Sequence, residues 1–265
     1  MPRGVRRAYH FIAALIALAV MHDVETHRLE NGLTLHVAGG HPAPVAAIQA
    51  WVGVGSADEA PSQAGVAHVV EHMLFRGVGA LSKVIGGSGG EINARTSFDH
   101  TVFHAVLGKD RIFDAIDAFG SALTRPTVEP DELALEKDVI LEEIRQGSDN
   151  PARSVAQSLF AAAFVAHPYR RPVIGSPESV SRLRERDLVE FFRSFYVADN
   201  TTVVVAGDVD PHEIHEAITR TFAAMPSGRP HRRFAPEPAQ TAPRAVASMR
   251  DVSEAYVAVG FHVPP

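Results

Sequence analysis

The stretch GVAHVVEHMLFRG, residues 65–77, decides how this chain is interpreted. An α-helix turns by roughly 100° per residue, so His68, Glu71 and His72 leave it from one face. The residues between them are apolar, which predicts a helix that is buried on most sides. Zn²⁺ prefers neutral imidazole and carboxylate ligands. The pattern therefore predicts a zinc site held by His68 and His72.

Glu71 lies between the two histidines, where it can take a proton from a water molecule. Zinc lowers the pKa of a bound water to about 7, so a nearby carboxylate can complete its deprotonation at neutral pH. This arrangement indicates a zinc peptidase. The alternative is a pair of core histidines without a metal. Each buried imidazole would then need a hydrogen-bond partner among its neighbours.

A third ligand is available in DELALEKDVILEEIRQG, residues 131–147. Its spaced apolar residues, acidic start and terminal glycine predict a helix. Glu136 and Glu143 are seven residues apart, so they lie almost above one another on one face. Acidic helix faces are usually solvated. This one becomes informative because two histidines need at least one more protein ligand.

Together these segments resemble the M16 (pitrilysin) family, which includes insulin-degrading enzyme and the mitochondrial processing peptidase. GVAHVVEHMLFRG, preceded by VGVGSADEAPSQA, resembles the inverted-zincin signature of that family. EKDVILEEI resembles its third-ligand segment, and GGEINARTSFDHTVFHAVL resembles the edge strand that receives substrate. The similarity extends over nearly all of residues 27–263 through HRLENGLTLHVA, HPYRRPVIGSPESV and ADNTTVVVAGDVDP.

The resemblance implies a role for each matching residue. His68, His72 and Glu143 match the zinc ligands, and Glu71 matches the general base. Glu136 matches an acid that supports the ligands. One zinc ion per chain and a peptide substrate are therefore expected.

The same resemblance implies that an extended peptide adds to an exposed edge strand beside the zinc. Backbone hydrogen bonds to such a strand depend little on the sequence of the peptide. The expected substrate-binding residues are Ile92, Asn93, Ala94, Arg95 and Thr96.

Composition narrows the remaining classes of function. The chain has 265 residues, of which 46% are hydrophobic, so it can bury one sizeable core and part of another. Its formal net charge of −6 gives no support for nucleic-acid binding, which calls for a basic stripe. The absence of cysteine excludes disulfides, thiol catalysis and thiolate zinc ligands.

Residues 1–22 resemble a secretory leader. MPRGVRRAYH supplies arginines without an acid, and FIAALIALAV is an apolar run too short for a membrane span of about 20 residues. We expect export to the periplasm or the extracellular space. An uncleaved leader that anchors the chain to a membrane is the alternative.

The order of elements predicts an α+β fold. Strands that come in pairs are interrupted by consecutive helices, which is typical of a layered sandwich rather than a doubly wound parallel sheet. We expect a two-layer sandwich of a mainly antiparallel sheet with packed helices, as the family resemblance also implies. The expected strands are residues 32–38, 45–54, 101–107 and 202–206, and the expected helices are 62–75, 111–123, 131–146, 154–164 and 178–195.

A change in composition divides the chain near its end. Residues 23–228 are expected to form the zinc-binding peptidase domain, and the Pro- and Arg-rich residues 229–245 a stiff linker. Residues 246–265 resemble the opening of a second, homologous domain, with a strand at 255–263. A single strand leaves its backbone groups unpaired. We therefore expect a fragment or a natural truncation that needs a second M16-type half or subunit, or that self-associates.

Two classes of function stay open at this point. The first is an active zinc endopeptidase, and the second is a non-catalytic or partner subunit of a paired assembly. Non-catalytic relatives generally lose a ligand or the base, whereas His68, Glu71, His72 and Glu143 are all present here. A metal-binding scaffold without turnover is a third and weaker alternative.

Overall fold

Alternating apolar residues build one six-stranded sheet in the described part of the chain. The computed structural model describes residues 24–76, 81–87, 89–230, 232 and 236–263. The strands are β1 (Glu25–Arg28), β2 (Thr34–Ala38), β3 (Val45–Val52), β4 (Glu91–Thr96), β5 (Thr101–Gly108) and β6 (Thr201–Gly207).

The strand order is β1-β2-β6-β3-β5-β4. β2 and β6 run parallel, whereas the other four neighbouring pairs are antiparallel. In the centre, Ile48 of β3 lies opposite Ala105 of β5 on one side and Val205 of β6 on the other. The predicted mainly antiparallel sheet is confirmed.

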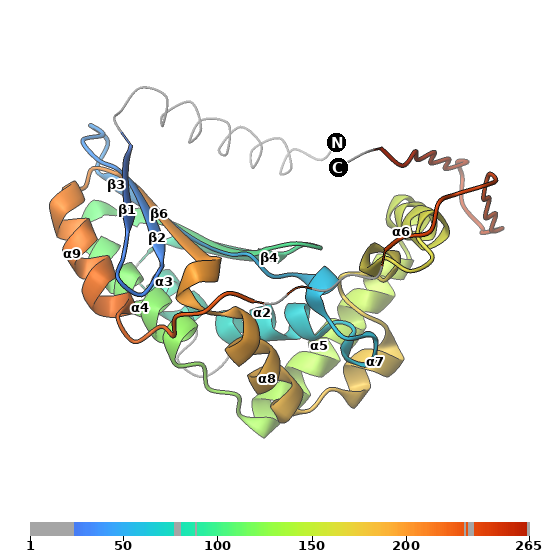
Figure 1. Cartoon of the computed structure of the whole chain (residues 1–265), viewed down its shortest axis with the longest axis horizontal. Helices are drawn as coiled ribbons and strands as arrows, with labels where there is room; N and C mark the ends of the chain where they lie inside the picture. The colour runs from blue at the N-terminus through green and yellow to red at the C-terminus, as the bar shows by residue number, and fades with distance from the viewer. Residues whose placement is uncertain (1–23, 77–80, 88, 231, 233–235, 264–265) are drawn as a thin grey trace.

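Helices pack against one face of this sheet, so the molecule has two layers (Figure 1). The predicted α+β sandwich is therefore confirmed. The helices are α2 (Val66–Arg76), α3 (Leu81–Gly87), α4 (Ile112–Thr124), α5 (Pro130–Ser148), α6 (Pro151–Ala163), α7 (Pro177–Arg182), α8 (Glu185–Phe195) and α9 (Pro211–Phe222). Short 3₁₀ turns occupy Ser56–Asp58, Pro61–Gln63, Lys109–Arg111, Pro168–Arg170 and Ala198–Asn200.

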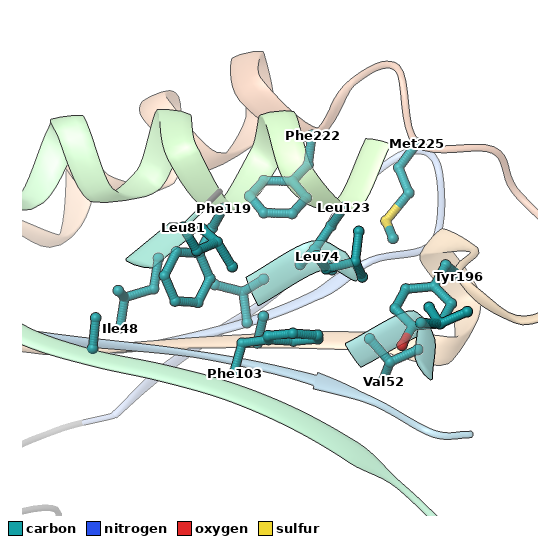
Figure 2. Close-up of a cluster of buried hydrophobic side chains, with 14 of the residues drawn as sticks. Ile48, Val52, Leu74, Leu81, Phe103, Phe119, Leu123, Tyr196, Phe222 and Met225 are labelled. Atoms are coloured by element: carbon teal, nitrogen blue, oxygen red, sulfur yellow. The ribbon is translucent and has the colours of Figure 1, made fainter. Parts of the chain in front are cut away.

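The core lies between the two layers. Leu35, Ile48 and Phe103 point from the sheet toward the helices and are fully buried, whereas Val45 and Trp51 on the opposite face of β3 are exposed. This follows from the two-residue period of a strand. Figure 2 shows how side chains from the sheet, α2, α3, α4 and α9 meet in one apolar cluster.

The helix α2 lies inside this layer and packs against α5, α8 and β4. Val66, Ala67 and Val69 have no exposed surface, and Met73 is nearly buried. The prediction of a helix that is buried on most sides is confirmed. The helix α2 starts later than predicted, because Pro61–Gln63 forms a separate turn before it.

One predicted helix is wrong. Residues 178–195 were expected to form a single helix, but the chain leaves the helical conformation at Leu183 and Arg184. The Arg184 N–H donates to Asp187 Oδ2 at 2.8 Å, which is the bond of a new helix start. The polar run before Leu188 therefore ends one helix and begins the next.

The strand predicted at Ala255–Val263 is also wrong. Residues 236–263 contain neither helix nor strand, and among the described residues no strand lies beside them to complete a ladder of hydrogen bonds. The division into domains stays a prediction. The leader at residues 1–22 lies outside the described residues, and none of the described helices is both long and apolar enough to cross a membrane.

Candidate metal centre

The start of α2 is fixed by two glycines and a buried acid. Gly65 adopts φ +96°, which favours glycine, and a Cβ there would lie 2.9 Å from the Ile174 carbonyl oxygen. The Glu59 carboxylate accepts hydrogen bonds from the N–H groups of Gly65 and Ala67, both at 2.9 Å. Gly175 has φ +79° and packs against the backbone of Gly65. These contacts set the direction in which α2 leaves the preceding loop.

His68 and His72 then lie on the same face of α2, as their spacing predicts. Their ring centroids are 4.7 Å apart. Glu71 is on that face as well, with its Oε2 3.9 Å from His68 Nε2. All three side chains are largely buried, so the face is enclosed rather than solvated.

The helix α5 supplies the two predicted acids to this face. Glu143 Oε2 lies 3.7 Å from His68 Nε2 and 3.8 Å from His72 Nε2. Glu136 Oε2 is 2.9 Å from His72 Nδ1, which leaves Nε2 of that ring directed at Glu143. The seven-residue spacing thus brings one acid to each end of the His72 ring.

His68, His72 and Glu143 form a group that fits a metal ion. Each offers one ligand atom, and the three atoms lie within 4.8 Å of one another. Ligands about 2.1 Å from a tetrahedral zinc are separated by roughly 3.4 Å, close to the spacing here. Two imidazoles and one carboxylate also suit zinc chemically, with one position left for water.

The protonation tendencies of His68 and Glu143 suit metal binding. Burial lowers the pKa of His68 to about 4, with a further contribution from His72, so His68 is neutral at physiological pH. The neighbouring His72 lowers the pKa of Glu143 and keeps that carboxylate ionised. Burial lowers the pKa of His72 too, but Glu143 and Glu136 outweigh it and raise the net value. Neutral imidazole and ionised carboxylate are the forms that bind a metal.

Glu71 is held where it can move a proton. It is 7% exposed, and Thr96 Oγ1 donates a hydrogen bond to its Oε2 at 3.1 Å. Burial raises the pKa of Glu71, although His72 and Thr96 oppose the shift. A carboxylate with a raised pKa accepts and returns a proton more readily near neutral pH.

A pocket of about 330 Å³ opens beside these groups at the edge of the sheet. β4 is the edge strand of the described sheet, as predicted for residues 92–96, since it pairs with β5 alone. Only part of the predicted segment reaches the pocket, and Ile92 and Asn93 do not line it. The lining residues are His68, Glu71, His72, Ala94, Arg95, Thr96, Glu143, Arg153, Val173 and Ile174.

Sequence reasoning missed three contributors to this site. Arg153 comes from α6, and Val173 and Ile174 come from the loop before α7. None of them belongs to the two helices whose periodicity identified the centre. Asn150-Pro151 was an available signal for the start of α6, because Asn caps helices and Pro suits their first position.

Three comparisons relate the chain to known proteins. The family model described as Insulinase (Peptidase family M16) matches residues 37–177, and that of the Peptidase M16 inactive domain matches residues 182–265. An uncharacterized zinc protease of Mycobacterium tuberculosis is 35% identical over 229 residues, which cover 83% of this chain and 52% of that protein.

Two further relatives extend the comparison. The mitochondrial-processing peptidase subunit beta of Blastocladiella emersonii is 29% identical and covers 92% of this chain and 53% of its own length. The crystal structure of the first half of the periplasmic protease PqqL from Escherichia coli matches with a TM-score of 0.72 and 27% identity, over 83% of this chain and 50% of that one. The chain thus spans about half the length of the curated relatives it matches.

The family match covers more than half of the chain and includes α2, α5 and the edge strand. The described sheet and helices also agree with those of solved protease structures. The chain therefore belongs to peptidase family M16.

Proposed function

We propose that this chain is the zinc-binding half of a metalloendopeptidase that cuts peptides held in extended form. The observation that carries the proposal is the group His68, His72 and Glu143, whose ligand atoms lie within 4.8 Å of one another beside the carboxylate of Glu71. A relative that is 35% identical is named a zinc protease. One zinc ion per chain would be held by these three residues.

When bound, zinc would polarise the peptide carbonyl and make water a better nucleophile at neutral pH. Glu71 takes the proton of the attacking water and passes it to the leaving nitrogen. Its burial raises its pKa toward the working pH, which favours both transfers. Thr96 holds the carboxylate through its hydrogen bond at Oε2.

Glu136 would act through His72 rather than on the substrate. Its 2.9 Å contact with Nδ1 selects the tautomer whose Nε2 lone pair faces the zinc position. His68 has no such support, since its buried Nδ1 has no hydrogen-bond partner among the described residues. We therefore assign to Glu136 the orientation of one ligand.

The substrate peptide would extend the sheet at β4. The outer side of this strand is free of a neighbouring strand in the described chain, and Ala94 to Thr96 line the pocket. The Ala94 N–H is bonded to the Asn93 side chain at 2.8 Å instead of to β5. Such an N–H can exchange an internal partner for a peptide carbonyl, which is how edge strands bind extended chains.

The partner would be a second M16-type half or subunit. The chain spans about half the length of its relatives. One relative is named a subunit, and another the first half of a protease. We propose that such a half closes over the pocket and completes the site. Export, or anchoring by an uncleaved leader, also stays a prediction, because residues 1–22 are outside the described residues.

Zinc content tests the ligand assignment. His68→Ala and His72→Ala should each lose the stoichiometric zinc of the parent protein, because two remaining ligands bind zinc weakly. His212→Ala is the matched control, since its side chain is 80% exposed on α9. Full zinc occupancy in both α2 variants would contradict the assignment.

Peptide hydrolysis separates the base from the ligands. Glu71→Gln keeps its size and zinc but cannot accept a proton, so turnover should fall by at least ~10²-fold. The assay is run with and without the second half, because the chain alone is expected to be weakly active. If Glu71→Gln cleaves peptides at the parent rate, the chain is not the enzyme proposed here. A complete lack of hydrolysis with zinc bound would favour a non-catalytic subunit.

A further inference from the structure

Arg153 occupies a rigid position at the corner between α5 and α6. Pro151 stands at the start of α6, and the Asn150 side chain accepts the Arg153 N–H at 3.1 Å. A capped first turn fixes the backbone of its residues. The cap therefore fixes the backbone from which the Arg153 side chain extends.

The guanidinium of Arg153 reaches the metal pocket. Its Nη2 lies 3.8 Å from Glu143 Oε1, and the side chain is 41% exposed. It crosses Gly147 of α5, where an added Cβ would lie 2.9 Å from Nη1. The absence of a side chain at Gly147 thus leaves the space that the guanidinium occupies.

The contact with Glu143 leaves Arg153 available to another anion. At 3.8 Å it is longer than a hydrogen bond, and the same carboxylate is a metal ligand in the proposed function. The positive charge also acts on the centre, since it contributes to the lowered pKa of Glu143. Arg153 is thus a solvent-reachable cation that lines the pocket beside Glu143.

Arg95 lines the same pocket but does not offer a second cation on the metal side. It alternates along β4 with Ala94, which packs on the core, and Thr96, which contacts Glu71. Successive side chains of a strand leave from opposite faces. The Arg95 side chain therefore leaves from the face of the sheet that is turned away from α2.

We propose that Arg153 selects peptides that carry an Asp or Glu side chain next to the scissile bond. A guanidinium binds a carboxylate through two parallel, charge-assisted hydrogen bonds, which an amide of equal size cannot match. The proposal rests on the proposed function, because it needs a peptide along β4. It assigns to Arg153 the choice of substrate and no part in bond cleavage.

Binding to a zinc-loaded Glu71→Gln variant of the full chain tests the proposal. The probes are fluorescent, end-blocked peptides in which one Glu is moved through successive positions of a neutral Gln-containing sequence. At one position Glu should bind about 10- to 100-fold more tightly than Gln. A free terminal carboxylate on a shortened peptide tests the other source of the same chemistry.

Arg153→Gln in the same background should remove that preference and leave the affinity for the Gln peptide nearly unchanged. Arg153→Glu should shift the preference to Lys at the same position. Gly147→Ala is a second variant, since it displaces the guanidinium without removing its charge. Arg186→Gln is the control, because that side chain is 76% exposed on α8.

The outcomes distinguish this proposal from the proposed function. Equal losses for Glu and Gln peptides in Arg153→Gln would mean a structural role and overturn the selection. So would a parent that binds peptides without any acidic preference, or one that prefers only the free terminal carboxylate. If no peptide binds and none is hydrolysed, the proposed function fails first.

Discussion

The start of α2 and the C-terminal segment, residues 236–263, are each held by a carboxylate that accepts backbone N–H groups. Glu59 accepts two such bonds at the start of α2. Glu237 accepts three, from Val165, Ala166 and His167, at 2.7 to 2.8 Å. The hydrogen-bonding chemistry is the same, but the two regions differ in what surrounds it.

Burial raises the pKa of both acids, but the balance between burial and the backbone hydrogen bonds differs. Glu59 is 5% exposed, and burial raises its pKa to about 8 even though Gly65 and Ala67 bond its ionised form. The Glu237 side chain is 14% exposed beside the segment that follows α6, and the effect of burial there is outweighed by the three N–H bonds, which lower its pKa to about 2. The same contact is thus part of the core in one region and attaches a segment to the surface in the other.

Replacement of Glu59 should show the largest effect. Glu59→Ala leaves the buried N–H groups of Gly65 and Ala67 without an acceptor, at about 1–3 kcal/mol each. We expect the free energy of unfolding to fall by about 2–5 kcal/mol and zinc affinity to fall with it, because α2 loses its fixed start. Urea unfolding and zinc titration measure both.

Glu237→Ala is the matched control for this experiment, since it removes three hydrogen bonds to backbone N–H groups where Glu59→Ala removes two. Similar losses of stability in the two variants would show that burial does not separate the two regions.

The pH dependence of stability sharpens the same contrast. The folded pKa of Glu59, about 8, lies above its unfolded value, so its contribution is full below the unfolded pKa and is lost as pH rises through about 8. The stability lost between pH 5 and 6.5 through this group amounts to about 2 kcal/mol. Glu59→Gln cannot ionise and should have a flatter profile of urea midpoint against pH. Parallel profiles for parent and variant would assign the pH dependence to other groups.

Glycines with positive φ allow a third comparison. Gly65→Ala should cost about 2 kcal/mol, because a Cβ at φ +96° is strained and also meets the Ile174 carbonyl. Gly228, just before the C-terminal segment, has φ +149° and open space around it. Gly228→Ala should therefore cost about 1 kcal/mol, the backbone strain alone. Thermal unfolding of the two variants measures the difference, and equal shifts would mean that contact with Ile174 is relieved at no cost.

Much of the fold and of the site could be predicted because it depends on local periodicity. The spacing of His68, Glu71 and His72 within an apolar run places them on one buried face, and the seven-residue spacing of Glu136 and Glu143 does the same on α5. The strand pattern likewise predicted the antiparallel sheet, whereas the family resemblance implied the edge position of β4.

The parts that were missed depend on contacts between distant segments. Glu59 reaches the start of α2 from a preceding loop, and Arg153 reaches the pocket across Gly147, so no periodic pattern marks either residue. The predicted strand at Ala255–Val263 has a suitable apolar pattern, but a strand also needs a neighbour. Pattern alone does not supply one.

The smallest effect is expected for Glu237. Arg244 donates to the carbonyls of Ala162 and Ala163 at the end of α6, and Arg250 donates to that of Ser148, so the C-terminal segment keeps other contacts when one acid is removed. Glu237→Ala should leave the free energy of global unfolding nearly unchanged. It should instead speed hydrogen exchange and proteolysis within the segment, because its opening is local.

At acidic pH, the contribution of Glu237 to stability should change in the opposite direction to that of Glu59. Its folded pKa, about 2, lies below the unfolded value, so its contribution is present above the unfolded pKa and is lost as pH falls through about 2. Protection of the N–H groups of Val165, Ala166 and His167 should follow this loss, and zinc content at neutral pH should not change in Glu237→Ala. Glu254→Ala, an exposed acid of the same segment, controls for charge. Release of zinc by Glu237→Ala would show that this segment supports the metal centre after all, and the contrast between the two regions would then be wrong.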